Sequence, residues 1–151
     1  MKGNTGEVVV ILPYVRNKIL LQLRDEIPGI AFPGQWGFFG GSIISGESTE
    51  VAGRRELLEE IGFSPEEMCF LETHVITDCG NLISHAYYCP LTVSLDRLAL
   101  TEGSDMGLFT VDEILQERLY SERHKAFFPV ATTYYIGFTA LRAMKELDKL
   151  R

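Results

Sequence analysis

The feature that most constrains this chain is an acidic segment from residue 41 to 63, with the sequence GSIISGESTEVAGRRELLEEIGF. It brings three carboxylates, Glu56, Glu59 and Glu60, into five residues behind a glycine-rich turn. Like charges four residues apart, as at Glu56 and Glu60, destabilise a helix by about 0.2–0.5 kcal/mol. Hard divalent cations prefer such oxygen ligands and offset the repulsion, so the segment indicates a metal-binding helix.

The expected helix has two different sides. At about 100° per residue, the three glutamates fall on one side and apolar residues fall on the other. The apolar residues are Val51, Leu57, Leu58 and Ile61. We therefore expect the helix to pack on the core through these four side chains and to present its carboxylates elsewhere.

The same segment carries signals for both helix ends. Ser48 or Thr49 can cap the start, and Gly62 can end the helix in the left-handed conformation. Arg55 follows Glu47 by eight residues and precedes Glu59 by four. We expect ion pairs of Arg55 with both, the first joining the preceding loop to the helix.

The spacing within the segment resembles the Nudix box. The matching positions are Gly41, Glu47, Arg55, Glu56, Leu57, Glu59, Glu60 and Gly62, followed by an apolar residue. Phe63 stands where the family more often has Ile, Leu or Val, and Phe39 stands where many relatives have Pro. The resemblance implies a single Nudix hydrolase domain over residues 1–151, with an α/β/α sandwich in which a mixed β-sheet lies between helices.

The resemblance also implies a metal site. Its ligands would be three carboxylates and one backbone carbonyl: Glu56, Glu59, Glu60, and Gly40 or Gly41. Donors that are all oxygen suit Mg²⁺, with Mn²⁺ as a substitute, rather than zinc. Arg55 and Glu47 would support catalysis by holding these ligands in place.

The implied activity is that of a Nudix pyrophosphohydrolase, which hydrolyses the pyrophosphate bond of a nucleoside diphosphate linked to another moiety. Glu56 and Glu59 belong to the catalytic group. The general base is a box glutamate, Glu102 or Asp105, and Glu102 is preferred because it stands in a loop just before a short expected strand. The alternative is a catalytically silent Nudix-like module that binds or senses a nucleotide.

Three residues are candidates for substrate binding. Arg24 suits bidentate recognition of phosphate, with a surface charge as its other interpretation. Trp36 and Phe38 could stack on a nucleobase, but aromatic side chains in such positions more often pack the core. The candidate substrates are nucleoside triphosphates, nucleotide sugars and ADP-ribose. The compact chain favours a small nucleotide or nucleotide sugar.

Composition limits the partners. A chain of 151 residues with 46% hydrophobic residues can build one sizeable core, and a net charge of −7 argues against nonspecific binding to nucleic acid or membranes. Cys69, Cys79 and Cys89 have no C-x-x-C spacing, so we expect reduced, mostly buried thiols in a cytoplasmic protein. The resemblance leaves a homodimer open, since family members are often dimers.

Apolar patterning predicts the remaining elements. We expect strands at residues 7–14, 17–24, 36–43, 68–77, 82–94 and 108–110, and helices at 111–119 and 129–150. Residues 25–35, rich in Pro and Gly, predict a loop, and residues 78–81 predict a turn. Strands interleaved with a few helices again favour an α/β sandwich.

Overall fold

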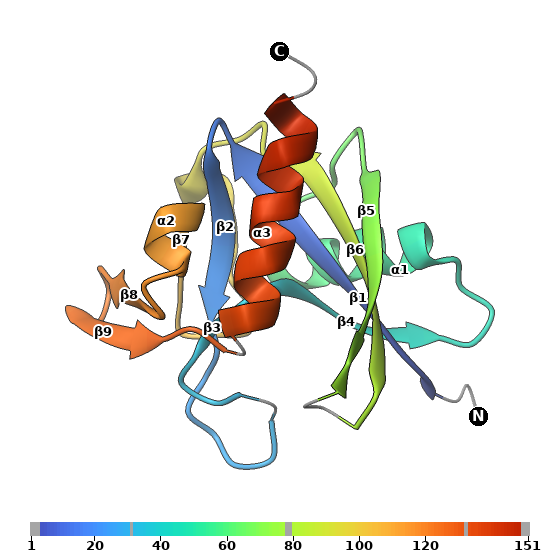
Figure 1. Ribbon diagram of the computed structural model, residues 1–151, viewed down its shortest axis with the longest axis horizontal. Helices are drawn as coiled ribbons and strands as arrows, with labels where there is room; N and C mark the ends of the chain where they lie inside the picture. Colours follow the sequence, from blue (N-terminus) through green and yellow to red (C-terminus); the bar gives the residue numbers. More distant parts are fainter. Residues whose placement is uncertain (1–3, 31, 78–79, 132, 149–151) are drawn as a thin grey trace.

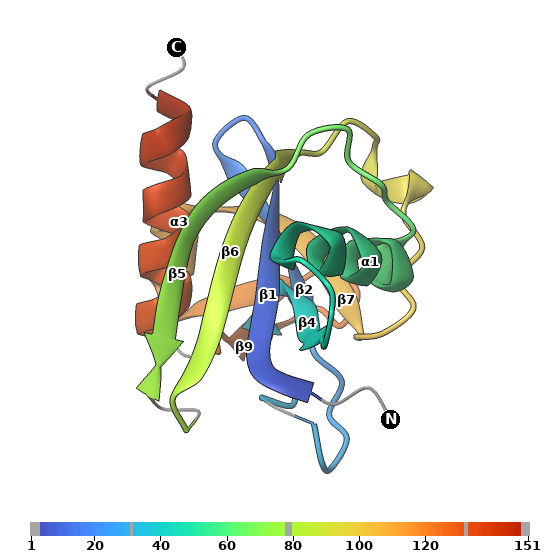
Figure 2. The ribbon, with the colours of Figure 1, turned by 90° about the vertical axis from the view of Figure 1, so that its right-hand side faces the viewer.

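A mixed β-sheet lies between two helices that cover its opposite faces (Figures 1 and 2). The computed structural model describes residues 4–30, 32–77, 80–131 and 133–148. Within these ranges the sheet has seven strands, β1 (Asn4–Val15), β2 (Lys18–Leu23), β3 (Trp36–Gly37), β4 (Phe39–Ile44), β5 (Cys69–Ile76), β6 (Leu82–Pro90) and β7 (Asp105–Thr110). The expected α/β/α sandwich is confirmed.

The long strand β1 organises the sheet because it pairs with three neighbours. It runs parallel to β6 and antiparallel to β4, with Val10 opposite Gly40, and only its end, from Tyr14, pairs with β2. β2 continues to β3 and β7, while β5 lies beyond β6. β4 therefore delivers the glycine-rich turn to the middle of the sheet, beside β1.

The other elements lie around this sheet. They are α1 (Thr49–Ile61), a 3₁₀ turn at Leu95–Arg97, α2 (Val111–Ile114), a hairpin of β8 (Arg118–Ser121) and β9 (Ala126–Pro129), and α3 (Thr133–Asp148). α1 lies on one face of the sheet and α3 on the other (Figure 2). No helix in the described ranges is long and apolar enough to cross a membrane.

Several predicted elements are corrected. The helix expected at 111–119 ends at Ile114, because Glu117 takes a left-handed conformation with φ 71° and the chain turns into β8. The helix expected at 129–150 starts at Thr133, since Pro129 belongs to β9. The strand expected at 36–43 is interrupted at Phe38, and the strand expected at 82–94 ends at Pro90. The predicted turn falls partly on residues 78 and 79, outside the described ranges.

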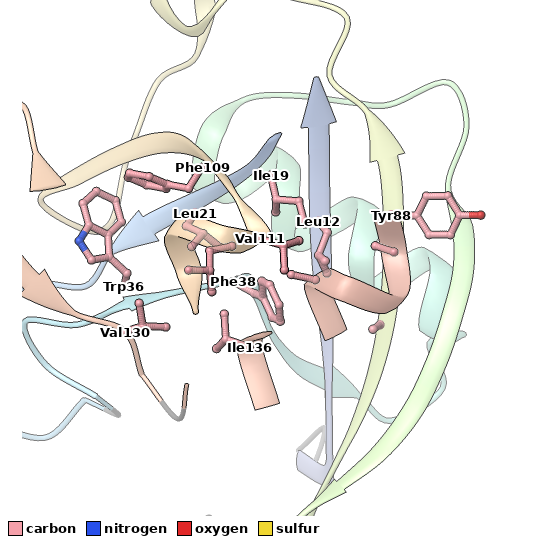
Figure 3. Packing of buried hydrophobic residues seen from close by; sticks show 14 of the residues in the cluster. Leu12, Ile19, Leu21, Trp36, Phe38, Tyr88, Phe109, Val111, Val130 and Ile136 are labelled. Atoms are coloured by element: carbon pink, nitrogen blue, oxygen red, sulfur yellow. The ribbon is translucent and has the colours of Figure 1, made fainter. Parts of the chain in front are cut away.

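The α3 face of the sheet carries a large apolar core (Figure 3). Trp36 is completely buried there, packs edge-on against Phe109 with ring centroids 4.9 Å apart, and donates its indole N–H to the carbonyl of Leu119. This burial favours the packing interpretation of Trp36, and its role as a substrate contact stays a prediction.

The α1 face is covered more closely, by small residues. Ala52 and Gly53 are buried, and a Cβ at Gly53 would stand 3.2 Å from Cγ2 of Val9 on β1. Leu57 and Ile61 are buried as predicted. The predicted orientation is otherwise wrong: Val51 and Leu58 are 55% and 54% exposed, and Glu60 is buried instead. Compared with the prediction, α1 is rotated about its own axis, so that Ala52, Gly53 and Glu60 face the sheet.

The described cysteines are free thiols. Cys69 is half-buried and Cys89 is fully buried, as predicted. Burial raises the pKa of the Cys89 thiol to about 12, so this sulfur stays protonated. Cys79 lies outside the described residues.

Candidate active site

Both predicted ends of α1 are confirmed. The Ser48 hydroxyl accepts a hydrogen bond from the backbone N–H of Val51 at 3.2 Å. Gly62 takes the left-handed conformation with φ 69°, and its N–H donates to the carbonyl of Leu58 at 3.0 Å. These caps fix where the acidic residues start and end along the helix.

Arg55 and Glu47 form the predicted link between the preceding loop and the helix. The guanidinium donates to both carboxylate oxygens of Glu47, from Nε at 2.7 Å and from Nη2 at 2.9 Å. Nη2 also donates to the carbonyl of Ser42 at 3.1 Å, and Glu47 accepts from the N–H of Ile44 at 2.9 Å. This bidentate pair is the strong, directional kind, and it holds the end of β4 against α1.

The same guanidinium reaches two further glutamates of the cluster. Its Nη1 lies 3.0 Å from Oε1 of Glu56 and 3.4 Å from Oε2 of Glu59. Burial raises the pKa of Glu56, the contact with Arg55 opposes this shift, and the charges of Glu59 and Glu102 add to it. Glu59 is the exposed member, with 59% of its side chain accessible. The single positive charge of the Arg55 guanidinium is thus shared by three carboxylates, those of Glu47, Glu56 and Glu59. The cluster is left with excess negative charge.

Glu60 is the least accessible carboxylate, with 6% of the residue exposed. Its Oε2 accepts a hydrogen bond from the backbone N–H of Gly40 at 2.9 Å. Burial raises its pKa to about 8, against the opposing effect of that N–H, and the nearby charges of Glu56 and Glu102 raise it further. Burying a carboxylate without a cation is costly, so the site favours a positive partner.

The glycine-rich turn is shaped around these carboxylates. A Cβ at Gly41 would lie 2.6 Å from the carboxyl carbon of Glu56. A Cβ at Gly40, where φ is 144°, would lie 2.0 Å from the carbonyl oxygen of Val9. The absence of a Cβ at Gly41 therefore lets Glu56 lie against the backbone of β4, and its absence at Gly40 lets β4 lie against the backbone of β1.

These donors fit a hard divalent cation by their chemistry. They are carboxylates and backbone carbonyls, with no nitrogen or sulfur ligand among the residues just described, and Mg²⁺ and Mn²⁺ prefer such oxygen donors. In the described part of the chain, no three His, Cys, Asp or Glu side chains already converge as a complete metal site. The guanidinium of Arg55 lies among these carboxylates instead.

The loop that carries Glu102 is fastened to the end of α1. The last carbonyls of a helix lack partners within the helix. Here Thr101 donates its N–H to the carbonyl of Glu60 at 2.9 Å and its hydroxyl to the carbonyl of Glu59 at 2.7 Å, and the N–H of Ala99 reaches Ile61 at 3.0 Å. The helix end and the loop are thus one connected unit.

A second anchor lies on the other side of Glu102. The N–H of Gly103 donates to Oδ2 of Asp25 at 3.1 Å, and the N–H of Ser104 donates to the carbonyl of Leu23 at 2.8 Å. Glu102 itself is exposed, and its charge raises the pKa of both Glu56 and Glu60. The fold therefore brings Glu102 to the acidic cluster on a backbone fixed at both sides.

Asp105, the other predicted base outside the box, has a different environment. Its Oδ2 accepts from the hydroxyl of Ser121 at 2.6 Å, and its Oδ1 accepts from the N–H of Met106 at 2.8 Å. These bonds fasten β7 to the β8–β9 hairpin. Because both carboxylate oxygens are engaged there, Asp105 is much less suited than Glu102 to act as a base.

A cavity of about 170 Å³ opens beside the glycine-rich turn, on the α3 face of the sheet. Arg24 and Phe38, both predicted substrate contacts, line it together with Phe32 and Tyr135. The remaining walls come from Val8, Val9, Val10, Gly37, Gly40, Gly41, Ile76, Leu82, Ala131 and Ile136. Its largely apolar walls suit a flat ring, and Arg24 suits a phosphate.

Sequence reasoning missed three residues at the site, Gln22, Asp25 and Thr101. Gln22 had a visible signal, because it is the polar residue inside an otherwise apolar strand, KILLQL, and it is 2% exposed. Asp25 and Thr101 had none, because their partners are 78 and 42 residues away in the sequence. Only the folded chain brings these groups together.

Comparison with known proteins gives one family. A model of the NUDIX domain matches residues 4–130. The nucleoside triphosphatase NudI of Escherichia coli is 41% identical over 56 residues, which is 35% of this chain and 38% of that protein. The chain therefore matches well under half the length of this curated relative.

Solved structures share the fold over nearly the whole chain. A mutT/nudix family protein from Listeria innocua superposes with a TM-score of 0.68 at 21% identity, covering 99% of this chain and 100% of that one. The NUDIX domain of Shewanella oneidensis NrtR, solved in complex with ADP ribose, has a TM-score of 0.66 at 22% identity, covering 97% and 90%. At sequence identities of 21% and 22%, these superpositions show a shared fold.

Proposed function

The chain belongs to the NUDIX family, and on that premise we propose that it is a pyrophosphohydrolase that uses Mg²⁺, or Mn²⁺ in its place, to cleave a nucleoside diphosphate linked to another moiety. The observation that carries the proposal is the buried carboxylate of Glu60, which lies at the Gly40 turn beside Glu56 and Glu102. An arrangement that gathers this much negative charge is stabilised by a cation. A cation held there can in turn bind a pyrophosphate.

Glu56, Glu59 and Glu60 would hold the cation, together with a carbonyl of Gly40 or Gly41. When bound, a divalent ion neutralises phosphate oxygens and lowers the pKa of a water molecule. Arg55 and Glu47 keep the helix and the end of β4 in register through their two hydrogen bonds of 2.7 and 2.9 Å. They support the ligands without touching the substrate.

We assign the general base to Glu102. Its backbone is anchored by Thr101 on one side and Gly103 on the other, while its side chain stays exposed near the cluster. A base must reach its proton within a hydrogen-bond distance, and a fixed backbone favours such reach. Glu102 would accept the proton of the attacking water.

The substrate would pass from the acidic cluster along Gly40 and Gly41, which also line the cavity, to Arg24 and Phe38 on the α3 face. Arg24 would bind a phosphate oxygen, and the aromatic walls would contact the base or another flat group. The similarity to a nucleoside triphosphatase and to a NUDIX domain bound to ADP ribose supports nucleoside triphosphates and ADP-ribose as candidates. A volume of about 170 Å³ has room for one flat group of such a substrate, and the compact chain favours a small nucleotide or nucleotide sugar.

A hydrolysis screen tests the proposal. Nucleoside triphosphates, nucleotide sugars and ADP-ribose are incubated with wild-type protein and with Glu59→Gln, each with Mg²⁺ and with EDTA, and released phosphate or nucleoside monophosphate is measured. We expect turnover of at least one substrate class, lost in EDTA and in the variant while circular dichroism is unchanged. Equal turnover by both proteins contradicts the assignment, and binding without turnover identifies a sensor module.

Three further proposals accompany this one. Residues 1–151 would unfold as one domain, which calorimetry tests by a single transition. The free thiols Cys69 and Cys89 suit a reducing compartment such as the cytoplasm, which fractionation tests. A homodimer, suggested by the family resemblance, is tested by sedimentation of the purified protein.

A further inference from the structure

The strand β5 lies at one edge of the sheet, with β6 on its inner side and no further strand beyond it in the described part of the chain. Figures 1 and 2 both show it at the outer margin of the sheet. An edge strand carries a row of backbone N–H and C=O groups that its own sheet does not use. The outer side of β5 is therefore able to pair with another strand.

This edge has little protection against such pairing. Lysine, proline and bulges commonly prevent edge strands from joining other chains. β5 has the sequence CFLETHVI, without Lys, Arg or Pro, and the irregularity in its pairing falls near its start, between Phe70 and Glu72. From Glu72 to Ile76 it pairs with β6 in regular register. This second part of the strand offers an uninterrupted edge.

Exposed apolar side chains accompany the edge. Val75 of β5 is 59% exposed, and Phe138 and Leu141 of α3 are 53% and 37% exposed. All three line a groove of about 450 Å³ whose walls come from β5, the residue after it, and α3. Apolar residues that gather in one exposed place, unlike scattered ones, mark contact surfaces. The outer side of β5 and this groove together form what we call the β5 edge surface.

The charges on the β5 edge surface have both signs. Glu72 lines the groove from β5, while Arg142 and Lys145 line it from α3. Because the whole chain carries a net charge of −7, two copies repel each other on average. A face that mixes acidic and basic groups can meet an identical face without this repulsion. The partner that fits this surface best is therefore a second copy of the chain.

A two-fold axis at Thr73 gives a favourable match between two such edges. The two copies of β5 then run antiparallel, with Thr73 opposite Thr73 and with Glu72 of each copy opposite His74 of the other. Threonine pairs, and pairs of an acidic with a basic side chain, stabilise such directly opposed positions. Within one chain the Nε2 atom of His74 already contacts the carboxylate of Glu72, so the axis would join two of these pairs into one network.

We propose that the β5 edge surface is the interface of a homodimer, in which β5 pairs antiparallel with β5 of a second copy and the groove beside Phe138 and Leu141 is covered by that copy. A two-fold interface is self-complementary, since each contact occurs twice. The inference rests on the homodimer proposed above and is independent of the proposed hydrolysis. It assigns that homodimer a surface and a register.

Charges introduced at the axis test the interface. Thr73 is exposed, so Thr73→Lys and Thr73→Glu should both fold, as circular dichroism can establish. Each variant places two like charges opposite each other across the axis, and we expect its dimer dissociation constant to rise by about 10-fold or more in sedimentation velocity. An equimolar mixture of the two variants should dimerise again, because Lys then faces Glu.

A matched control adds the same charge elsewhere. Phe127 of β9 is 54% exposed and lies in the β8–β9 hairpin, outside the β5 edge surface. Phe127→Lys should leave the dimer dissociation constant unchanged. If the Thr73 variants do not fold, Val75→Lys replaces them, since it adds a lysine to the same edge at a side chain that is 59% exposed.

The outcomes separate the interface from the other proposals. Weaker dimers of both Thr73 variants, restored by mixing and with the control unchanged, support the interface. A wild-type dimer that persists undiminished in the folded edge variants overturns the interface and leaves the homodimer standing, and weakened dimers that mixing does not restore overturn the axis at Thr73. A wild-type monomer at every concentration overturns the homodimer and its interface together. Hydrolysis is tested separately, by the screen with Glu59→Gln.

Discussion

α3 and α1 pack on opposite faces of the same sheet, yet they bring different chemistry to the contact (Figure 2). α3 buries aliphatic groups, among them Ile136 and Ala140, in the large apolar cluster. α1 buries Ala52 and Leu57, but also the carboxylate of Glu60. The α3 face stabilises the fold, while the α1 face buries an ionisable group whose charged form apolar packing alone disfavours.

One polar contact on each face illustrates the difference. On the α3 face, the hydroxyl groups of Ser84 and Tyr135 bond each other at 2.6 Å, and both are neutral at physiological pH. On the α1 face, carboxylates share the single guanidinium of Arg55. The difference teaches that a site for a cation can be recognised by the charge that its own fold leaves incompletely balanced.

The largest expected effect is on the α1 face. Glu56→Gln keeps the shape of the side chain and removes its charge. We expect kcat/KM to fall by about 10³-fold, or about 4 kcal/mol at 1.36 kcal/mol per tenfold change. Without metal, the free energy of unfolding should stay equal or rise, because one of the repelling charges is gone. A loss of stability matching the loss of activity would remove the contrast between the faces.

The opposite signature is expected on the α3 face. Leu12 of β1 is fully buried in the cluster that α3 covers. Leu12→Ala should lower the free energy of unfolding by about 2–5 kcal/mol, through lost burial and the cavity left behind. The kcat of the protein that remains folded should be unchanged, as urea denaturation and kinetics at low temperature can establish.

A smaller effect is expected at the turn between the faces. A Cβ at Gly41 would meet the carboxylate of Glu56 at 2.6 Å, so Gly41→Ala must displace that flexible side chain. We expect Mn²⁺ affinity to weaken by about 10–100-fold with the fold retained. In a Glu56→Gln background the same change should add little, and full additivity in this double-mutant cycle would contradict the proposed contact.

The most gradual effect, about 1 kcal/mol for each pH unit, is a dependence of stability on pH. Burial raises the pKa of Glu60 from 4.5 to about 8, so between these values the folded state holds a proton that the unfolded state has released. Its contribution to stability is complete below pH 4.5 and is lost as pH rises through 8. In EDTA, urea denaturation should show stability falling by about 1 kcal/mol per pH unit in this window. Glu60→Gln should lack this component.

Local signals in the sequence were reliable where the partner lies close in the chain. Ser48, Gly62 and the pair of Arg55 with Glu47 were all predicted, since each acts within a few turns of α1. The orientation of α1 was wrong because hydropathy gave weight to Leu58 and Val51. Hydropathy gave no weight to the close contact between Gly53 of α1 and Val9 of β1, and this contact sets which side of the helix faces the sheet.

Features that depend on distant pairing could not be predicted. The β8–β9 hairpin is a local feature that was missed for another reason, because the exposed aromatic residues Tyr120 and Phe127 hide the apolar alternation of its strands. The fixed position of Glu102 depends on Thr101 reaching carbonyls 41 and 42 residues earlier. The sequence therefore identified the acidic cluster, whereas the contacts that position its surroundings required the folded chain.

The most direct test of the central claim is a crystal structure of the protein soaked with Mn²⁺, with the ion located by its anomalous scattering. The account predicts an anomalous peak bounded by the carboxylates of Glu56, Glu59 and Glu60, at about 2.0–2.5 Å from their oxygens. A peak elsewhere on the protein, with these three carboxylates free of any ion, would contradict it.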